Sequence, residues 1–261
     1  MAVIQITLSK CFRYSIVKRE ENMSPNPITC ACLNDLCLSK VPLFASLDHG
    51  SLTKITSQMQ HKSYRKGETI IREGSPSMGF TVIQQGSAKA YRITGDGREQ
   101  ILYIFPTYDY FGARFLFTEE VVPYSVEALE DSQVCILSKK LLMTLLAEHP
   151  PVAIELIEAM ANRMRRLELV IQSMGGRNAD MRIASLLLEF IDTYGKKTER
   201  GIVVKLPLSR EGIANYLGIA RETLSRKLTQ MEEDGIISFL DSRLMLVENR
   251  ESLVSLSAFA E

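Results

Sequence analysis

The hydrophobic positions of this chain follow two different periods. Between residues 62 and 137, short β-rich runs are separated by glycine turns, which predicts strands at 69–71, 80–83, 89–93, 101–105 and 134–137. Regular spacing of this kind is typical of a small barrel or roll. After Pro150 and Pro151, which suit the first turn of a helix, the spacing becomes helical. The pattern therefore predicts an α+β protein in which a roll precedes a helical region.

The first long helix carries a narrow apolar seam. Its members recur every three or four residues, as in a coiled coil: Ile157, Met160, Met164, Leu167, Ile171 and Met174. A helix that packs on its own domain usually has a wider apolar stripe. Charged residues flank this seam, and Gly175-Gly176 ends it. The seam favours a dimerisation helix over residues 150–176, with a second copy of the chain as partner.

Two short helices are predicted on either side of Gly218. Ser209 suits the N-cap of the first helix, and Gly218 permits the left-handed residue that a helix-turn-helix corner needs. The second helix would bury Leu224, Leu228 and Met231, which recur at helical spacing. The sequence therefore predicts a helix-turn-helix.

The opposite face of the second helix gathers polar side chains in its opening turns: Arg221, Glu222, Ser225 and Arg226. An Arg fork matches guanine O6 and N7, and a Glu accepts from cytosine N4. The alternative is an ordinary solvated helix with i,i+4 pairs. The short first helix, the glycine corner and the clustering in the opening turns favour DNA reading. Ser209 and Lys227 are further DNA-binding candidates, with Lys227 expected on phosphate.

Composition narrows the class of protein. The chain has 261 residues and a net charge of +0, enough for two globular domains and unlike a disordered polyelectrolyte. No apolar run is long enough to span a membrane, no ordered signal peptide opens the chain, and the five cysteines do not suggest a secreted disulfide framework. A cytoplasmic protein without a membrane partner is expected. The histidines are scattered and no nucleophile motif or phosphate loop is present, so an enzyme is not expected.

The string Arg-Glu-Thr-Leu-Ser-Arg at 221–226 resembles the recognition helix of the Crp/Fnr superfamily of bacterial transcription regulators. Glu222 and Arg226 match its base-reading pair, Ser225 is typical of the Fnr branch, and Arg221 is typical of the Crp branch. Ala220 departs from the Ser or Thr cap that many members carry. The resemblance covers roughly residues 42–247, and Met23 is an alternative start because the resemblance begins only after it.

The resemblance implies an N-terminal cyclic-nucleotide-binding-like β-roll, a long dimerisation helix and a C-terminal winged helix-turn-helix. The expected division is a cysteine-bearing segment at 1–40, the roll at 41–149, the dimerisation helix at 150–176 and the DNA-binding domain at 177–261, with a wing hairpin at 235–247. It also implies a homodimer that binds palindromic double-stranded DNA and contacts RNA polymerase. Arg221 favours TGTGA-like half-sites over TTGAT-like ones.

Two motifs of the roll depart from the cyclic-nucleotide binders that it resembles. Those proteins carry Phe-Gly-Glu and later an Arg before Ser or Thr, which hold the ribose and the cyclic phosphate. Here the positions read Phe111-Gly112-Ala113 and Pro123-Tyr124-Ser125. A buried phosphate would therefore lack its charge partner, and cyclic AMP is not expected as a ligand.

Four cysteines are candidates for a redox or metal site: Cys30, Cys32, Cys37 and Cys135. Fnr-type sensors use four such thiolates for a [4Fe-4S] cluster, although the spacing Cys-x-Cys-x4-Cys is tighter than theirs. A second branch uses a thiol/disulfide pair, which Cys37 and Cys135 resemble. The third alternative is that Cys135 is a small buried hydrophobe with no redox role. The expected function is a redox- or oxygen-responsive regulator, and the alternative is a regulator that responds to a small-molecule effector.

Overall fold

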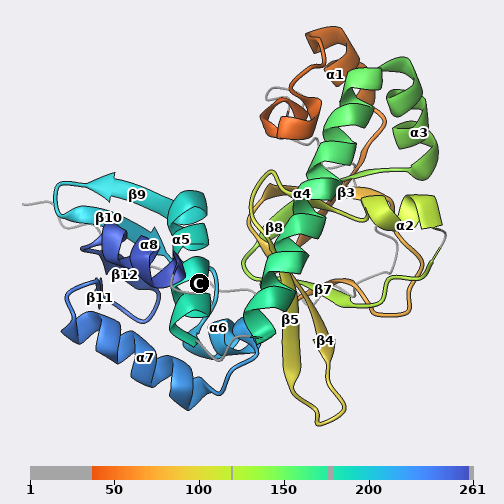
Figure 1. Cartoon of the computed structure of the whole chain (residues 1–261). Coiled ribbons are helices and arrows are strands. Elements are labelled where there is room, and N and C mark those ends of the chain that lie inside the picture. The colour runs from red at the N-terminus through yellow and green to blue at the C-terminus, as the bar shows by residue number, and fades with distance from the viewer. Residues whose placement is uncertain (1–36, 119, 176–178, 259–261) are drawn as a thin grey trace, which may run out of the picture. The chain divides into compact units, whose positions relative to one another are not determined.

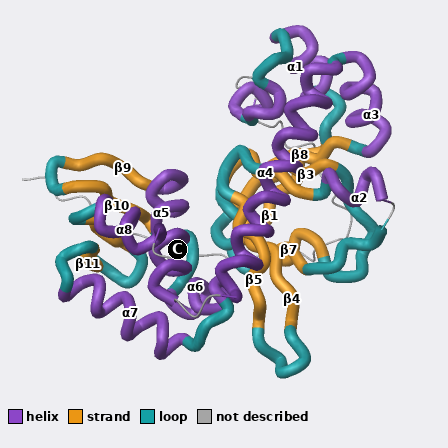
Figure 2. Tube along the Cα trace, viewed as in Figure 1, coloured by secondary structure: helices purple, strands orange, loops and turns teal. Residues whose placement is uncertain are grey.

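The structure is a computed structural model, and it describes residues 37–118, 120–175 and 179–258 (Figure 1). Side chains are not described at Cys37, at Arg166, at 169–175 or at Ala258. The strands fall into two stretches of the chain, and helices precede, separate and follow them (Figure 2). In the described part of the chain, no helix is both long and apolar enough to cross a bilayer.

The first stretch of strands forms two four-stranded antiparallel sheets, which together we call the roll. Their strand orders are β1-β8-β3-β6 and β2-β7-β4-β5. The bounds are β1 (Gln60–Tyr64), β2 (Thr69–Ile71), β3 (Phe80–Gln85), β4 (Ala88–Ile93), β5 (Glu99–Phe105), β6 (Tyr110–Phe111), β7 (Ser125–Ala128) and β8 (Ser132–Leu137). The predicted runs all lie in these strands. The sequence did not predict β1, β6 or β7.

Aromatic side chains crowd together in the roll. The rings of Phe105 and Phe111 lie 5.0 Å apart, those of Tyr103 and Tyr124 6.0 Å apart, and those of Phe115 and Tyr124 5.8 Å apart. These residues belong to, or pack against, one buried apolar core that both sheets share. Burial is the main cause that raises the pKa of Tyr124 to about 12, so its hydroxyl stays protonated at neutral pH.

Two glycines, one just before β3 and one just after β6, let backbone segments of the roll approach closely. Gly112 has a φ of 92°, which an L side chain rarely adopts. A Cβ on Gly112 would lie 2.2 Å from the carbonyl oxygen of Gly79, and a Cβ on Gly79 would lie 2.3 Å from the carbonyl oxygen of Leu137. Packing alone therefore requires glycine at both positions.

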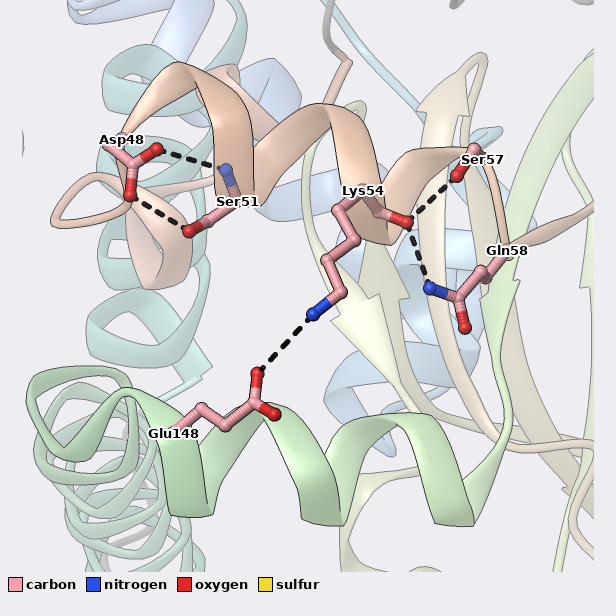
Figure 3. A network of polar contacts seen from close by, with 6 residues as sticks. All are labelled: Asp48, Ser51, Lys54, Ser57, Gln58 and Glu148. Carbon is pink, nitrogen blue, oxygen red and sulfur yellow. Dashed lines mark hydrogen bonds and ion pairs between the residues drawn. The ribbon is translucent and has the colours of Figure 1, made fainter.

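Short helices precede, interrupt and follow the strands of the roll along the chain. Asp48 caps α1 by accepting from the backbone N–H of Ser51 at 3.0 Å and from its hydroxyl at 2.8 Å (Figure 3). Lys54 of α1 faces Glu148 of α3 at 3.9 Å, but both side chains are more than half exposed, so this pair contributes little stability. The bounds are η2 (Cys37–Lys40), η3 (Pro42–Phe44), α1 (His49–Thr56), α2 (Ala113–Thr118) and α3 (Lys139–Glu148).

The long helix α4 spans Pro150–Gly175 and contacts the roll through Arg163. The Arg163 guanidinium lies 2.8 Å from an Asp109 carboxylate oxygen and donates to the carbonyl of Tyr110 at 2.6 Å. It also stacks on the Tyr110 ring, 4.5 Å from the ring centroid. Val152 and Leu156 are buried in the first turns of α4. One side of α4 is therefore held by the chain's own residues.

The C-terminal part combines helices with the sheet β11-β12-β10-β9. Its apolar core includes Ile183, Leu187 and Phe190 of α5. The predicted wing is confirmed, because β11 pairs with β12 and Phe239 lies opposite Met245. The sequence did not predict β9, β10 or α8. The bounds are α5 (Ala179–Tyr194), β9 (Gly195–Thr198), β10 (Gly201–Lys205), α6 (Arg210–Leu217), α7 (Arg221–Glu233), β11 (Ile237–Phe239), β12 (Leu244–Val247) and α8 (Arg250–Ala258).

Candidate functional site

The corner between α6 and α7 has the predicted geometry. The Ser209 hydroxyl oxygen accepts from the backbone N–H of Gly212 at 3.1 Å, so Ser209 is the N-cap of α6. Gly218 ends α6 in the left-handed conformation, with φ 63° and ψ 37°. The Ile219 N–H then donates to the carbonyl of Ala214 at 3.1 Å, which satisfies a carbonyl at the helix end. The two helices therefore meet in a helix-turn-helix.

Helix α7 buries the predicted apolar stripe. Leu224, Leu228 and Met231 are 0%, 1% and 3% exposed, and they join the core of the C-terminal part. Ala220 occupies the N-cap position and supplies no side-chain hydrogen bond. Packing of the stripe, rather than capping, therefore holds the start of α7 in place.

The predicted polar residues share the uncovered face of α7. Arg221, Glu222 and Arg226 are exposed, and Ser225 is half-buried. Among the residues that the structure describes, these side chains form no hydrogen bond or ion pair with one another or with a neighbour. Their donors and acceptors are thus available to a ligand that presents hydrogen-bonding edges.

A hollow of about 490 Å³ adjoins this face, between the start of α6, the start of α7 and the wing. Arg210 and Arg243 line it beside Arg221, and neither was predicted from the sequence as a site residue. The Arg210 guanidinium lies 4.6 Å from the centroid of the Phe239 ring. The three guanidinium groups outnumber the two carboxylates that also line the hollow, those of Glu211 and Asp241, and this excess of positive charge suits phosphate oxygens. The only available signal was that the predicted wing contains Arg243.

Lys227 lies on the flank of α7 and is already engaged within the chain. Its ammonium lies 2.6 Å from a carboxylate oxygen of Asp180 in the first turn of α5. The side chains are 31% and 29% exposed, respectively. The structure therefore separates Lys227 from the uncovered face, and its expected contact with phosphate stays a prediction.

The predicted seam of α4 lies on the outside of the chain. Ile157, Met160, Met164 and Leu167 are 66%, 37%, 62% and 42% exposed. Ile154, at 57%, extends the same line toward the start of the helix and was not predicted. The side chains of Ile171 and Met174 lie outside the described residues. The described members thus form an uncovered apolar line.

Cys135 is the one cysteine candidate whose surroundings the structure describes. It is fully buried in β8, directly opposite His61 of β1. Its thiol donates to the Gln84 side-chain oxygen at 3.2 Å, and its sulfur lies 3.2 Å from His61 Nδ1. Cys30, Cys32 and the side chain of Cys37 lie outside the described residues. Whether these cysteines come together therefore stays a prediction.

The His61 imidazole influences the chemistry of the Cys135 thiol. Burial lowers the pKa of His61, so the imidazole beside the sulfur favours its uncharged form and stabilises a thiolate weakly. Within the described ranges, no group of three or more His, Cys, Asp or Glu side chains is arranged to hold a metal ion. Cys135 could supply one thiolate to a cluster, and the other three would have to come from the N-terminal segment.

Comparison with known proteins supports this arrangement. Residues 61–149 match the family described as cyclic nucleotide-binding domain, and residues 181–256 match the Crp-like helix-turn-helix domain. The structure of FixK2 from Bradyrhizobium japonicum is 30% identical, covers 78% of this chain and 99% of its own, and superposes with a TM-score of 0.69. The chain belongs to the Crp/Fnr family. It is a DNA-binding transcription regulator and not an enzyme.

Other Crp/Fnr relatives differ in what their names say of a signal. The transcriptional activator protein anr of Pseudomonas aeruginosa is 29% identical over 220 residues, which are 84% of this chain and 88% of the relative. The CRP-like cAMP-activated global transcriptional regulator of Mycobacterium tuberculosis is 25% identical over 219 residues, 84% of this chain and 97% of the relative. Membership of the Crp/Fnr family therefore leaves the signal open.

Proposed function

We propose that this protein is a homodimer that reads a palindromic DNA site with two copies of α7. The observation that carries the proposal is the uncovered face of Arg221, Glu222, Ser225 and Arg226, whose polar groups have no partner among the described residues. Arginine and glutamate in the opening turns of a recognition helix can distinguish base pairs in the major groove. Arg210 and Arg243, at the adjoining hollow, would hold the DNA backbone.

Selection from a pool of random duplexes tests this proposal. Two symmetry-related helices should enrich inverted repeats whose half-sites lie about 10 bp apart, centre to centre. Because Arg221 can take an additional guanine, TGTGA-like half-sites should outnumber TTGAT-like ones. Enrichment of a single, non-repeated motif would argue against the dimeric site, and the absence of any enriched motif would argue against base reading.

The uncovered seam of α4 supports the homodimer. Ile154, Ile157, Met164 and Leu167 expose apolar surface along one line of the helix. In a coiled coil, each of these side chains would enter a gap on the partner helix and leave water. The second copy would thereby place the second recognition helix that a palindrome requires.

We propose that cyclic AMP is not the signal to which this regulator responds. Ala113 and Tyr124 stand where the ligand's ribose and phosphate would need charged partners. The aromatic rings around Tyr124 also occupy space in the core of the roll. Calorimetry should record no heat when cyclic AMP is added, and micromolar binding would overturn this part of the proposal.

We propose further that the regulator responds to a redox or oxygen signal through its cysteines. Cys135 would pair with Cys37 as a disulfide, or Cys30, Cys32, Cys37 and Cys135 would together hold a [4Fe-4S] cluster. An absorption band at about 400 nm after anaerobic purification would indicate the cluster. Loss of free thiols on mild oxidation without that band would indicate the disulfide. If neither occurs, the alternative is a regulator that responds to a small-molecule effector.

Whatever the signal, we propose that the regulator acts in the cytoplasm and contacts RNA polymerase.

A further inference from the structure

The first turn of α5 is bonded to both helices of the helix-turn-helix. The Asp180 carboxylate lies 2.6 Å from the ammonium of Lys227 in α7. The Arg182 guanidinium donates to the carbonyl of Leu217, at the end of α6, at 3.0 Å. Two residues that are close in sequence thus hold two elements that lie 35 and 47 residues further along the chain.

The contacts of Asp180 and Arg182 lie at helix ends, where charged side chains are stabilised by the partial charges of the helix. The last carbonyls of a helix have no partner within the helix and carry partial negative charge, so Arg182 satisfies such a group on α6. Asp180 stands in the first turn of its own helix, where a negative charge is favourable. The side chains of Asp180 and Lys227 are both less than a third exposed. Water and salt therefore screen this ion pair less than an exposed pair.

Lys227 follows Arg226 directly in α7. Arg226 points to the uncovered face, whereas Lys227 is turned to α5. The orientation of a recognition helix decides whether its side chains reach base edges, and small displacements weaken those contacts. A bond that fixes Lys227 to α5 therefore also limits how Arg226 can move.

We propose that Asp180 and Arg182 are positioning residues for DNA reading, and that Lys227 acts through Asp180 and not on a DNA phosphate. They hold α7 at a fixed orientation to α5, the helix that follows α4 in the chain. A displacement of α5 would then be carried to the base-reading side chains. The inference rests on the base-reading role proposed above.

A double-mutant cycle in the full-length protein tests it. Asp180→Asn, Lys227→Gln and the double variant would be titrated with the duplex that the wild-type protein selects from a random pool, and with random duplex, over a range of salt. Each variant should lose about threefold to tenfold in affinity for the selected duplex, with a smaller loss for random duplex. The loss in the double variant should be clearly smaller than the product of the two single losses, because both single variants break the same bond between Asp180 and Lys227. The salt slope should stay that of the wild-type protein.

A phosphate contact by Lys227 gives the opposite pattern. Lys227→Gln would then reduce the salt slope by about 1 and weaken all sequences alike. Asp180→Asn would tighten binding to every duplex, because it removes a negative charge and releases the ammonium. Either result overturns the inference.

Asp192→Asn is the matched control. Asp192 lies on the same helix and pairs with Arg250 at 3.5 Å, but the side chains are 69% and 50% exposed. Loss of the Asp192 carboxylate should leave the preference for the selected duplex unchanged. Asp180→Glu keeps the charge and should retain most of that preference. A lower thermal midpoint for Asp180→Asn with an unchanged preference would mean a structural role only, which overturns the inference. If the wild-type protein itself showed no preference, the base-reading role would fail instead.

Discussion

Helices α4 and α7 each present a face that nothing in the described part of the chain covers, but the two faces differ in chemistry. On α4 the uncovered side chains are apolar, as at Ile157 and Met164. On α7 they are charged, as at Arg221 and Arg226. An apolar line gains free energy by leaving water with a matching apolar line. Charged groups lose free energy in such a contact unless the partner offers hydrogen bonds and opposite charge.

The comparison shows that apolar spacing alone does not assign a partner. Both helices also bury a few residues against their own chain, Leu156 in α4 and Leu224 and Leu228 in α7. What separates them is the composition of the remaining face. This difference is the reason for proposing a second copy of the chain as the partner of α4 and DNA as the partner of α7.

The largest expected effect is at the seam. Met164→Glu would bring two carboxylates, one from each protomer, into the apolar contact, where an unpaired buried charge costs several kcal/mol. The protein should become monomeric by light scattering and lose affinity for a palindrome. Asn162→Glu, at an exposed position on the same helix, should remain dimeric. If Met164→Glu also remained dimeric, the seam would not be the interface.

The next largest effect is on the free energy of unfolding, which should differ between a buried and an uncovered leucine. Leu228→Ala should cost about 2–5 kcal/mol of the free energy of unfolding, because the side chain is 1% exposed and its loss leaves a cavity. Leu167→Ala should cost much less, since its side chain is 42% exposed within one chain. Urea denaturation of both changes in the Met164→Glu background would compare them without the dimer. Equal costs would contradict the burial difference.

A smaller effect is expected on the charged face. Arg226→Ala should cost about 1–3 kcal/mol of binding free energy and relax the preference at one G·C pair. Arg243→Ala, at the adjoining hollow, should instead weaken all sequences alike and lower the salt slope by about 1. Fluorescence titration with matched and single-substituted duplexes would separate the two. An equal loss on all duplexes for Arg226→Ala would make that residue a backbone contact.

The smallest effect concerns the start of α7. Ala220→Ser would add the missing cap and should stabilise the protein by about 0.5–1 kcal/mol, whereas Ser209→Ala would remove a cap that is present and cost about 1 kcal/mol. Thermal denaturation would measure both changes. A loss of stability in Ala220→Ser would mean that the backbone of the corner does not permit the cap.

Local patterns account for what the sequence predicted. The capping serine, the left-handed glycine and the stripe of α7 lie within a few residues of one another, so they could be read directly. Strand β1, with the sequence Gln-His-Lys-Ser-Tyr, has no apolar alternation, and β9 is Gly-Lys-Lys-Thr. Backbone pairing with neighbouring strands holds them, and that pairing is invisible in a single sequence.

Contacts between distant residues account for most of what was missed in the candidate site. The ion pair of Asp180 with Lys227 joins residues 47 positions apart, and the contact of His61 with Cys135 joins residues 74 positions apart. The charge of Lys227 is evident from the sequence, whereas the Asp180 carboxylate that lies beside it is seen only in the fold. The polarity of a residue is therefore predictable, whereas its partner is a property of the fold.

The close backbone approach at Gly112 limits what the Phe111-Gly112 pair says about a ligand. Gly112 is needed because a side chain would collide with the carbonyl of Gly79, whatever the roll binds. The Phe111-Gly112 pair would thus be present in a roll that never meets a nucleotide. This pair therefore reports the architecture of the roll, and evidence about its ligand has to come from the positions expected to meet the ribose and the phosphate, which Ala113 and Tyr124 occupy here.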